Sequence, residues 1–73
     1  MTLERLPEFP QRALLTGQEQ NVVCCLIHEM TNKEAARAMN ISPRTVEDYR
    51  CKALHKLGVR NVAGLMRVVY QIH

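Results

Sequence analysis

The side chains best suited to binding a charged ligand are concentrated in the second half of the sequence. Residues 1–30 contain two arginines against four glutamates, a net charge of −2, whereas residues 31–73 contain eight lysines and arginines against three acids, a net charge of +5. Lysine and arginine donate charge-assisted hydrogen bonds to phosphates and carboxylates. This segregation of positive charge in a small domain indicates a polyanionic partner, with a solvated basic surface as the alternative.

Two adjacent acids, Glu47 and Asp48, interrupt the basic segment 41–58, which reads ISPRTVEDYRCKALHKLG. In the first turns of a helix, acids favour the helix dipole, and Asp48 has the spacing to pair with Arg44 and Lys52. A carboxylate could instead accept a hydrogen bond from a cytosine amino group. It could also repel phosphates and so reduce non-specific binding. We favour intrahelical pairing for Asp48, and base readout or selectivity for Glu47.

Other combinations of reactive side chains are incomplete. Cys24 and His28 could supply two metal ligands, but zinc normally takes four, so no metal site is expected. Cys51 has no partner in a redox motif, and the odd total of three cysteines indicates reduced thiols. The sequence has no glycine-rich phosphate loop, nucleophile elbow or plausible pair of catalytic acids. It therefore predicts neither an enzyme nor a cofactor.

Capping signals and helical periodicity predict the elements that must position these side chains. Thr16 and Glu19 have capping-box spacing at the start of the first helix. The apolar stripe of that helix consists of Val22, Val23, Leu26, Ile27 and Met30. A short, alanine-rich helix is expected over residues 33–39, with Asn32 as its N-cap. The turn that follows is expected to place Ile41 in the core.

A third and a fourth helix are predicted in the same way. Ser42 caps the third helix, Pro43 occupies its first position, and Gly58 ends it in a left-handed conformation. Its inward stripe consists of Val46, Tyr49, Ala53 and Leu57. Asn61 caps a fourth helix over residues 62–72. The inward residues of that helix are Val62, Leu65, Val69 and Ile72. The expected fold is therefore all-α, a four-helix bundle that contains a helix-turn-helix.

Composition and hydropathy predict the domain organisation and the cellular compartment. Residues 1–14 contain two prolines and no clear period, and are expected to be a linker or N-terminal arm that precedes a domain over residues 15–73. Hydrophobic residues make up 47% of the chain, as in globular domains, and no apolar run approaches the roughly 20 residues of a membrane span. The N-terminus has no signal-peptide pattern. A cytoplasmic protein without a membrane partner is expected.

Three motifs in order and spacing make the chain resemble the LuxR/FixJ-type (GerE-like) DNA-binding domain of bacterial transcription regulators, in particular its response-regulator branch. The motifs are LTGQE at 15–19, TNKEAARAMNISPRTVEDYR at 31–50 and KLGVRN at 56–61. The resemblance implies that residues 33–39 form a scaffold helix and residues 43–57 a recognition helix that enters the major groove. It also implies that the last helix pairs two copies.

We therefore expect the output domain of a two-component response regulator, which binds paired half-sites on double-stranded DNA as a homodimer. The expected base contacts are Arg44, Glu47, Asp48, Cys51 and Lys52. The expected phosphate contacts are Thr31, Asn32, Lys33, Thr45, Arg50, Lys56 and Arg60. The expected dimer interface consists of Ala63, Met66, Arg67 and Tyr70, although Met66 and Tyr70 could instead complete the core. The alternative function is a helical protein-interaction module that contacts RNA polymerase or antagonises a related regulator.

A few positions depart from the pattern of the family. Gly17 replaces the usual proline, which weakens helix initiation slightly. Tyr49 replaces the usual histidine of the recognition helix, so any contact of the imidazole must be made by a phenol or lost. Ala35 and Ala53 replace bulky aliphatic residues, which implies a thinner core around the recognition helix. The expected fold does not change.

Overall fold

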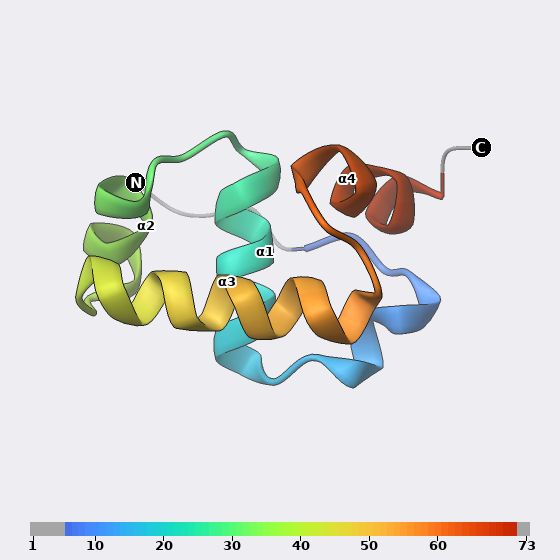
Figure 1. The fold of residues 1–73 in the computed structure, drawn as a ribbon, viewed down its shortest axis with the longest axis horizontal. Helices are drawn as coiled ribbons and strands as arrows, with labels where there is room; N and C mark the ends of the chain where they lie inside the picture. Colours follow the sequence, from blue (N-terminus) through green and yellow to red (C-terminus); the bar gives the residue numbers. More distant parts are fainter. Residues whose placement is uncertain (1–5, 72–73) are drawn as a thin grey trace.

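The computed structural model describes residues 6–71, which form helices joined by short turns (Figure 1). A 3-10 helix, η1 (Pro10–Leu14), precedes the four α-helices. These are α1 (Gly17–Ile27), α2 (Asn32–Met39), α3 (Pro43–Leu57) and α4 (Val62–Tyr70). No strand occurs between residues 6 and 71, so the predicted all-α fold is confirmed. The long α3 packs mainly against α1, which crosses it, and against α2, which lies beside its N-terminal end (Figure 1).

The start of α2 differs from the prediction. Thr31, and not Asn32, is the N-cap: the Glu34 N–H donates to Thr31 Oγ1 at 3.1 Å, and the Thr31 N–H donates to Glu34 Oε1 at 2.9 Å. The prediction of Asn32 was wrong because Thr31 stands three residues before a glutamate, and that spacing closes a reciprocal capping box. Asn32 becomes the first residue of the helix.

The other caps follow the sequence signals. Thr16 and Glu19 form the predicted capping box of α1. Ser42 Oγ accepts from the Thr45 N–H at 3.2 Å, and Asn61 Oδ1 accepts from the Gly64 N–H at 2.8 Å. These side chains satisfy backbone N–H groups that have no partner inside the helix.

The C-terminal ends are less regular than expected. Gly58 ends α3 in the predicted left-handed conformation, with φ +69°. The predicted end of the fourth helix at residue 72 was wrong, because Gln71 adopts a left-handed conformation (φ 53°) and stops α4 at Tyr70. Val62 is half-buried, and Leu65 and Val69 are buried as expected. Ile72 lies outside the described residues.

Two clusters of apolar side chains form the core. The smaller one lies between α1, α2 and α3 and contains Val22, Cys25, Ala35, Ala36 and Val46, with Ile41 and Tyr49 packed against it. The larger one joins the N-terminal segment to α1, α3 and α4. Its buried members are Leu6, Phe9, Leu15, Val23, Cys24, Ile27, Ala53, Leu54, Leu57, Leu65 and Val69. The third helix therefore rests on the smaller cluster with its N-terminal half and on the larger cluster with its C-terminal half.

The segment before residue 15 contributes to this core. Leu6 and Phe9 are buried in the larger cluster, which the sequence pattern did not indicate. The domain boundary between residues 14 and 15 stays a prediction. Within residues 6–71, no helix combines the length and the hydropathy that crossing a membrane requires.

Candidate nucleic-acid interface

The turn between α2 and α3 fixes the angle at which the two helices meet. Asn40 adopts a left-handed conformation with φ 57°, and the Ile41 N–H donates to the carbonyl oxygen of Ala36 at 3.0 Å. Asparagine tolerates this conformation better than most residues that carry a Cβ. With Ser42 as the next N-cap, the chain leaves one helix and enters the other within three residues. The predicted helix-turn-helix is present.

The outer face of α3 carries the residues expected to contact bases. Arg44, Glu47, Asp48, Cys51 and Lys52 are all exposed. The opposite face is buried through Val46, Ala53, Leu54 and Leu57. The five residues lie between positions 44 and 52, so this part of the face extends over about two and a half turns of the helix. The placement of the five side chains on one solvent-facing surface is as expected, and their contacts with bases stay a prediction.

The two acids on this face have no ionic partner within residues 6–71. Among residues 6–71, ion pairs join Arg12 to Glu8 and Lys56 to Glu19, and none involves Glu47 or Asp48. The predicted pairing of Asp48 within the helix is therefore not formed there. Exposed ion pairs gain little because long side chains lose entropy when they are held together. Both carboxylates are consequently available to a ligand.

The residues expected to contact phosphates are of three kinds. Lys33 and Arg60 are exposed, and their side chains have no hydrogen-bond partner among the described residues. The hydroxyl groups are already used locally: Thr31 Oγ1 in the α2 cap, and Thr45 Oγ1 at 2.8 Å from Ser42 Oγ. Asn32 and Arg50 are half-buried, and Arg50 Nε is buried with no hydrogen-bond partner in the described part of the chain. Thr31, Asn32, Lys33 and Thr45 lie at the N-terminal ends of α2 and α3, whereas Arg50 lies in the middle of α3 and Arg60 in the turn after it.

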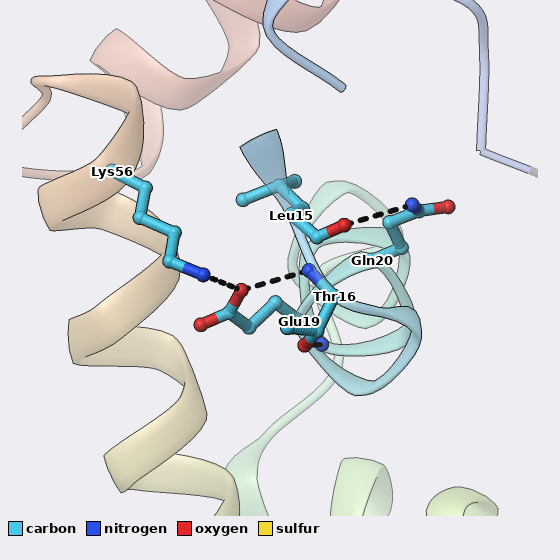
Figure 2. Close-up of polar contacts among 5 residues, drawn as sticks. All are labelled: Leu15, Thr16, Glu19, Gln20 and Lys56. Carbon is cyan, nitrogen blue, oxygen red and sulfur yellow. Dashed lines mark hydrogen bonds and ion pairs between the residues drawn. The ribbon is translucent and has the colours of Figure 1, made fainter. Parts of the chain in front are cut away.

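Lys56 has a partner that sequence reasoning missed. Its Nζ lies 2.6 Å from Glu19 Oε1, and the same oxygen accepts from the Thr16 N–H at 2.9 Å (Figure 2). The Glu19 side chain is 3% exposed and that of Lys56 is 37% exposed. The available signal was the position of Glu19, three and four residues before Val22 and Val23, which places it on the buried face of α1.

This contact sets the charge state of Glu19. Burial raises the pKa of its carboxyl group, but the hydrogen bond from Lys56, the hydrogen bonds from Thr16 and the nearby ammonium charge outweigh that effect. The net result is a pKa below the ordinary value of glutamate. Glu19 is therefore a carboxylate at neutral pH, and the buried charge is compensated by Lys56.

The outward residues of α4 form a short stripe. Ala63, Arg67 and Tyr70 are exposed, and the exposed fraction of Tyr70 is 47%. Met66 is half-buried and packs against the larger core cluster, so part of the proposed dimer interface contributes to the core. The pairing of two copies through this stripe stays a prediction.

Reactive side chains elsewhere do not gather into a site. Cys24 and Cys25 are buried and Cys51 is exposed; burial raises the pKa of the Cys25 thiol, which keeps it protonated. Across residues 6–71 no three histidine, cysteine or acidic side chains come together as metal ligands. A surface hollow of about 360 Å³ lies beside α2 and is lined by Met30, Glu34, Arg37 and Ala38.

The sequence of this chain matches a known protein family. Residues 13–69 match the family described as bacterial regulatory proteins, luxR family. The spore germination protein GerE of Bacillus subtilis is 40% identical over 53 residues, which cover 73% of this chain and 72% of that protein. The transcriptional regulatory protein FixJ of Azorhizobium caulinodans is 37% identical over 54 residues, covering 74% of this chain and 26% of FixJ.

A further relative has the same partial coverage. The C4-dicarboxylate transport transcriptional regulatory protein DctR of Rhodobacter capsulatus is 38% identical over 50 residues, which cover 68% of this chain and 25% of DctR. The chain thus spans about a quarter of FixJ and of DctR. No solved structure gives a significant match. The family match covers most of the chain, including both helices of the helix-turn-helix, and this chain belongs to the luxR family of bacterial regulatory proteins.

Proposed function

We propose that this chain binds double-stranded DNA in a sequence-specific manner as a bacterial transcription regulator, with α3 in the major groove. The observation that carries the proposal is the solvent-facing surface of α3, whose members are Arg44, Glu47, Asp48, Cys51 and Lys52. An α-helix fits the width of the major groove, where base edges present distinct donors and acceptors. The chain acts in this proposal by binding and not by catalysis.

The charge distribution supports the same proposal. Residues 31–73 carry a net charge of +5, and the exposed Lys33 and Arg60 lie in α2, before α3, and in the turn after α3. The N-terminal end of α2 adds free backbone N–H groups that can hold a phosphate. Phosphate contacts of this kind set the register of a protein on the duplex, and base contacts provide the sequence preference.

The finer assignment rests on the relatives. Several of them are named as transcriptional or response regulatory proteins, and the chain matches about a quarter of most of these proteins. The proposal is therefore that the chain serves as the DNA-binding output domain of a two-component response regulator in the cytoplasm. Two copies would pair through Ala63, Met66, Arg67 and Tyr70, and each copy would bind one of two paired half-sites, since one short helix reads few base pairs. RNA polymerase is a further proposed partner.

Selection of duplexes from a randomised DNA pool, followed by affinity measurements at several salt concentrations, tests the proposal. DNA binding predicts an enriched sequence and a log affinity that falls linearly with log salt. Enrichment of an inverted or direct repeat would support a dimer. An affinity that hardly changes with salt would contradict the proposal and favour a protein-interaction module.

Two matched variants separate the possible roles of the acids. Glu47→Gln and Asp48→Asn each remove one exposed charge with almost no change in shape. A carboxylate that accepts from a cytosine amino group predicts a changed preference at one base position. A carboxylate that only repels phosphates predicts the same preferred sequence with tighter binding to all duplexes. Comparing the DNA sequence that each variant selects with the one that the wild-type chain selects shows which of the two roles each acid has.

A further inference from the structure

We infer that Glu19 and Lys56 form a positioning pair that fixes α3 relative to α1, and that Lys56 does not contact DNA phosphates. The inference rests on the proposed function, DNA binding by α3, and deepens it. It also changes one expectation from the sequence, in which Lys56 was a phosphate contact.

The pair joins two helices that are far apart in the sequence. Glu19 lies in the first turn of α1 and Lys56 in the last turn of α3, 37 residues later, and their side chains meet at 2.6 Å (Figure 2). Elsewhere, α1 and α3 pack through apolar residues such as Val23 and Ala53. Apolar packing is non-directional, whereas a charged hydrogen bond has a preferred geometry. The pair therefore restricts sliding and rotation of the C-terminal end of α3.

Glu19 is itself held in place. Its Oε1 accepts the Thr16 N–H at 2.9 Å, and its own N–H donates to Thr16 Oγ1 at 3.2 Å. The carboxylate is thus fixed to the backbone of α1 before it binds Lys56, and it is almost fully buried. A buried carboxylate needs hydrogen-bond donors and an opposite charge to offset its loss of solvation, and Lys56 supplies the opposite charge here.

The charge of Lys56 is consequently used inside the protein. When a lysine binds a DNA phosphate, its positive charge releases counterions from the DNA, and this release makes the affinity depend on salt. The effect requires a positive charge that no neighbouring acid already neutralises. An ammonium group paired at 2.6 Å with a buried carboxylate presents little net charge to the solvent. Breaking the pair to reach a phosphate would also leave Glu19 charged and buried. Lys56 therefore affects DNA binding through the position of α3.

Two single variants give opposite results under the two roles. The probe is a labelled duplex that the wild-type chain selects from a randomised pool, and the affinity is measured as a function of salt. If the pair positions α3, Glu19→Gln should weaken binding about threefold to tenfold, because fewer molecules hold α3 in the competent orientation. The salt slope should not change. If Lys56 contacts a phosphate, Glu19→Gln releases its ammonium group and should strengthen binding.

Lys56→Met provides the second measurement. A phosphate contact predicts that the salt slope falls by about 0.9, the contribution of one phosphate on duplex DNA. A positioning role predicts weaker binding with an unchanged slope. Each single variant removes the same interaction. The double variant, Glu19→Gln with Lys56→Met, should therefore lose no more affinity than the single variant that binds DNA less tightly.

Ile27→Val is the matched control for general destabilisation. It shortens one buried side chain at the opposite end of α1 and leaves Thr16, Glu19 and Lys56 as they are, so binding by the folded chain should stay unchanged. All variants are compared at a temperature where circular dichroism shows them fully folded. Unchanged or stronger binding by Glu19→Gln, or a slope reduced by about 0.9 in Lys56→Met, would overturn the inference and leave the proposed function intact. A wild-type chain that selects no duplex would instead overturn the proposed function, and this inference with it.

Discussion

Replacement of Gly58 by alanine tests whether the end of α3 depends on backbone conformation alone. Gly58 has φ +69° and ψ 28°, its N–H donates to the carbonyl oxygen of His55 at 3.1 Å, and the Val59 N–H donates to that of Leu54 at 3.0 Å. A Cβ added at Gly58 would meet no atom within 4 Å. Steric overlap with neighbouring side chains therefore contributes nothing, and the left-handed conformation decides the effect.

The magnitude follows from two opposing terms. A residue with a Cβ costs about 1–2 kcal/mol in the left-handed region. Replacing a glycine also reduces the conformational freedom of the unfolded chain, which raises the free energy of unfolding by about 0.4–1 kcal/mol. Gly58→Ala should therefore lower the free energy of unfolding by about 1 kcal/mol. Gly58→Asn should cost less, since asparagine tolerates this conformation.

Gly17 provides a matched comparison. A Cβ there also meets nothing within 4 Å, but its φ is not positive, and the residue occupies the first position of α1. Only the unfolded-state term remains, so Gly17→Ala should raise the free energy of unfolding by about 0.4–1 kcal/mol. The same substitution is thus expected to have opposite signs at two equally open positions.

Thermal and urea unfolding followed by circular dichroism measure both effects. For a chain of this size, a change of 1 kcal/mol corresponds to a shift in Tm of roughly 4–8 °C. The two alanine variants should therefore have Tm values on opposite sides of the wild-type value. A neutral Gly58→Ala, or two shifts of the same sign, would refute the argument from backbone conformation.

Three further predictions concern stability. Glu29 also has a positive φ, 58°, so Glu29→Gly should raise the free energy of unfolding by about 0.5–1 kcal/mol, measured in urea; a loss would show that the Glu29 side chain makes a stabilising contact. The pKa of Glu19 lies below its ordinary value of 4.5, so its contribution to stability is complete above that pH and is lost as the pH falls through the folded-state pKa. Acid unfolding of Glu19→Gln should lack this component, and an unchanged acid profile would contradict the assignment. Leu65 is fully buried, and Leu65→Ala should cost about 2–5 kcal/mol, enough to unfold much of so small a domain; a cooperative transition near the wild-type Tm would contradict this.

Local signals were sufficient to predict most of the fold. The capping residues Thr16, Ser42 and Asn61 each act within one turn of the helix that they start, and helical periodicity gave the outer face of α3. The errors arose where two local signals competed or were missing. Thr31 and Asn32 are both good N-caps, and only the spacing to a glutamate separates them.

Long-range contacts could not be predicted from the sequence. The pairing of Lys56 with Glu19 depends on how α3 crosses α1, and helix spacing does not specify this crossing. The burial of Leu6 and Phe9 likewise depends on the path of the chain before α1. For Asp48, correct spacing did not produce an ion pair, because exposed pairs have little net stabilisation. The positions of the candidate site residues were therefore predictable, whereas their partners were not.

The division of the core into two clusters has a consequence for local opening. The N-terminal half of α3 and all of α2 rest on a cluster that contains two alanines, a cysteine and two valines. The fully buried side chains of this cluster are small, so separating α2 from the body exposes fewer large buried side chains than unfolding the C-terminal half of α3, which contains Leu54 and Leu57. Local opening costs least where few apolar contacts must be broken, and amide hydrogens of α2 then exchange faster than those of the C-terminal half of α3. A DNA duplex that contacted α2 and α3 together would bind only the closed state. Binding would therefore reduce local opening and slow the exchange of the amide hydrogens of α2.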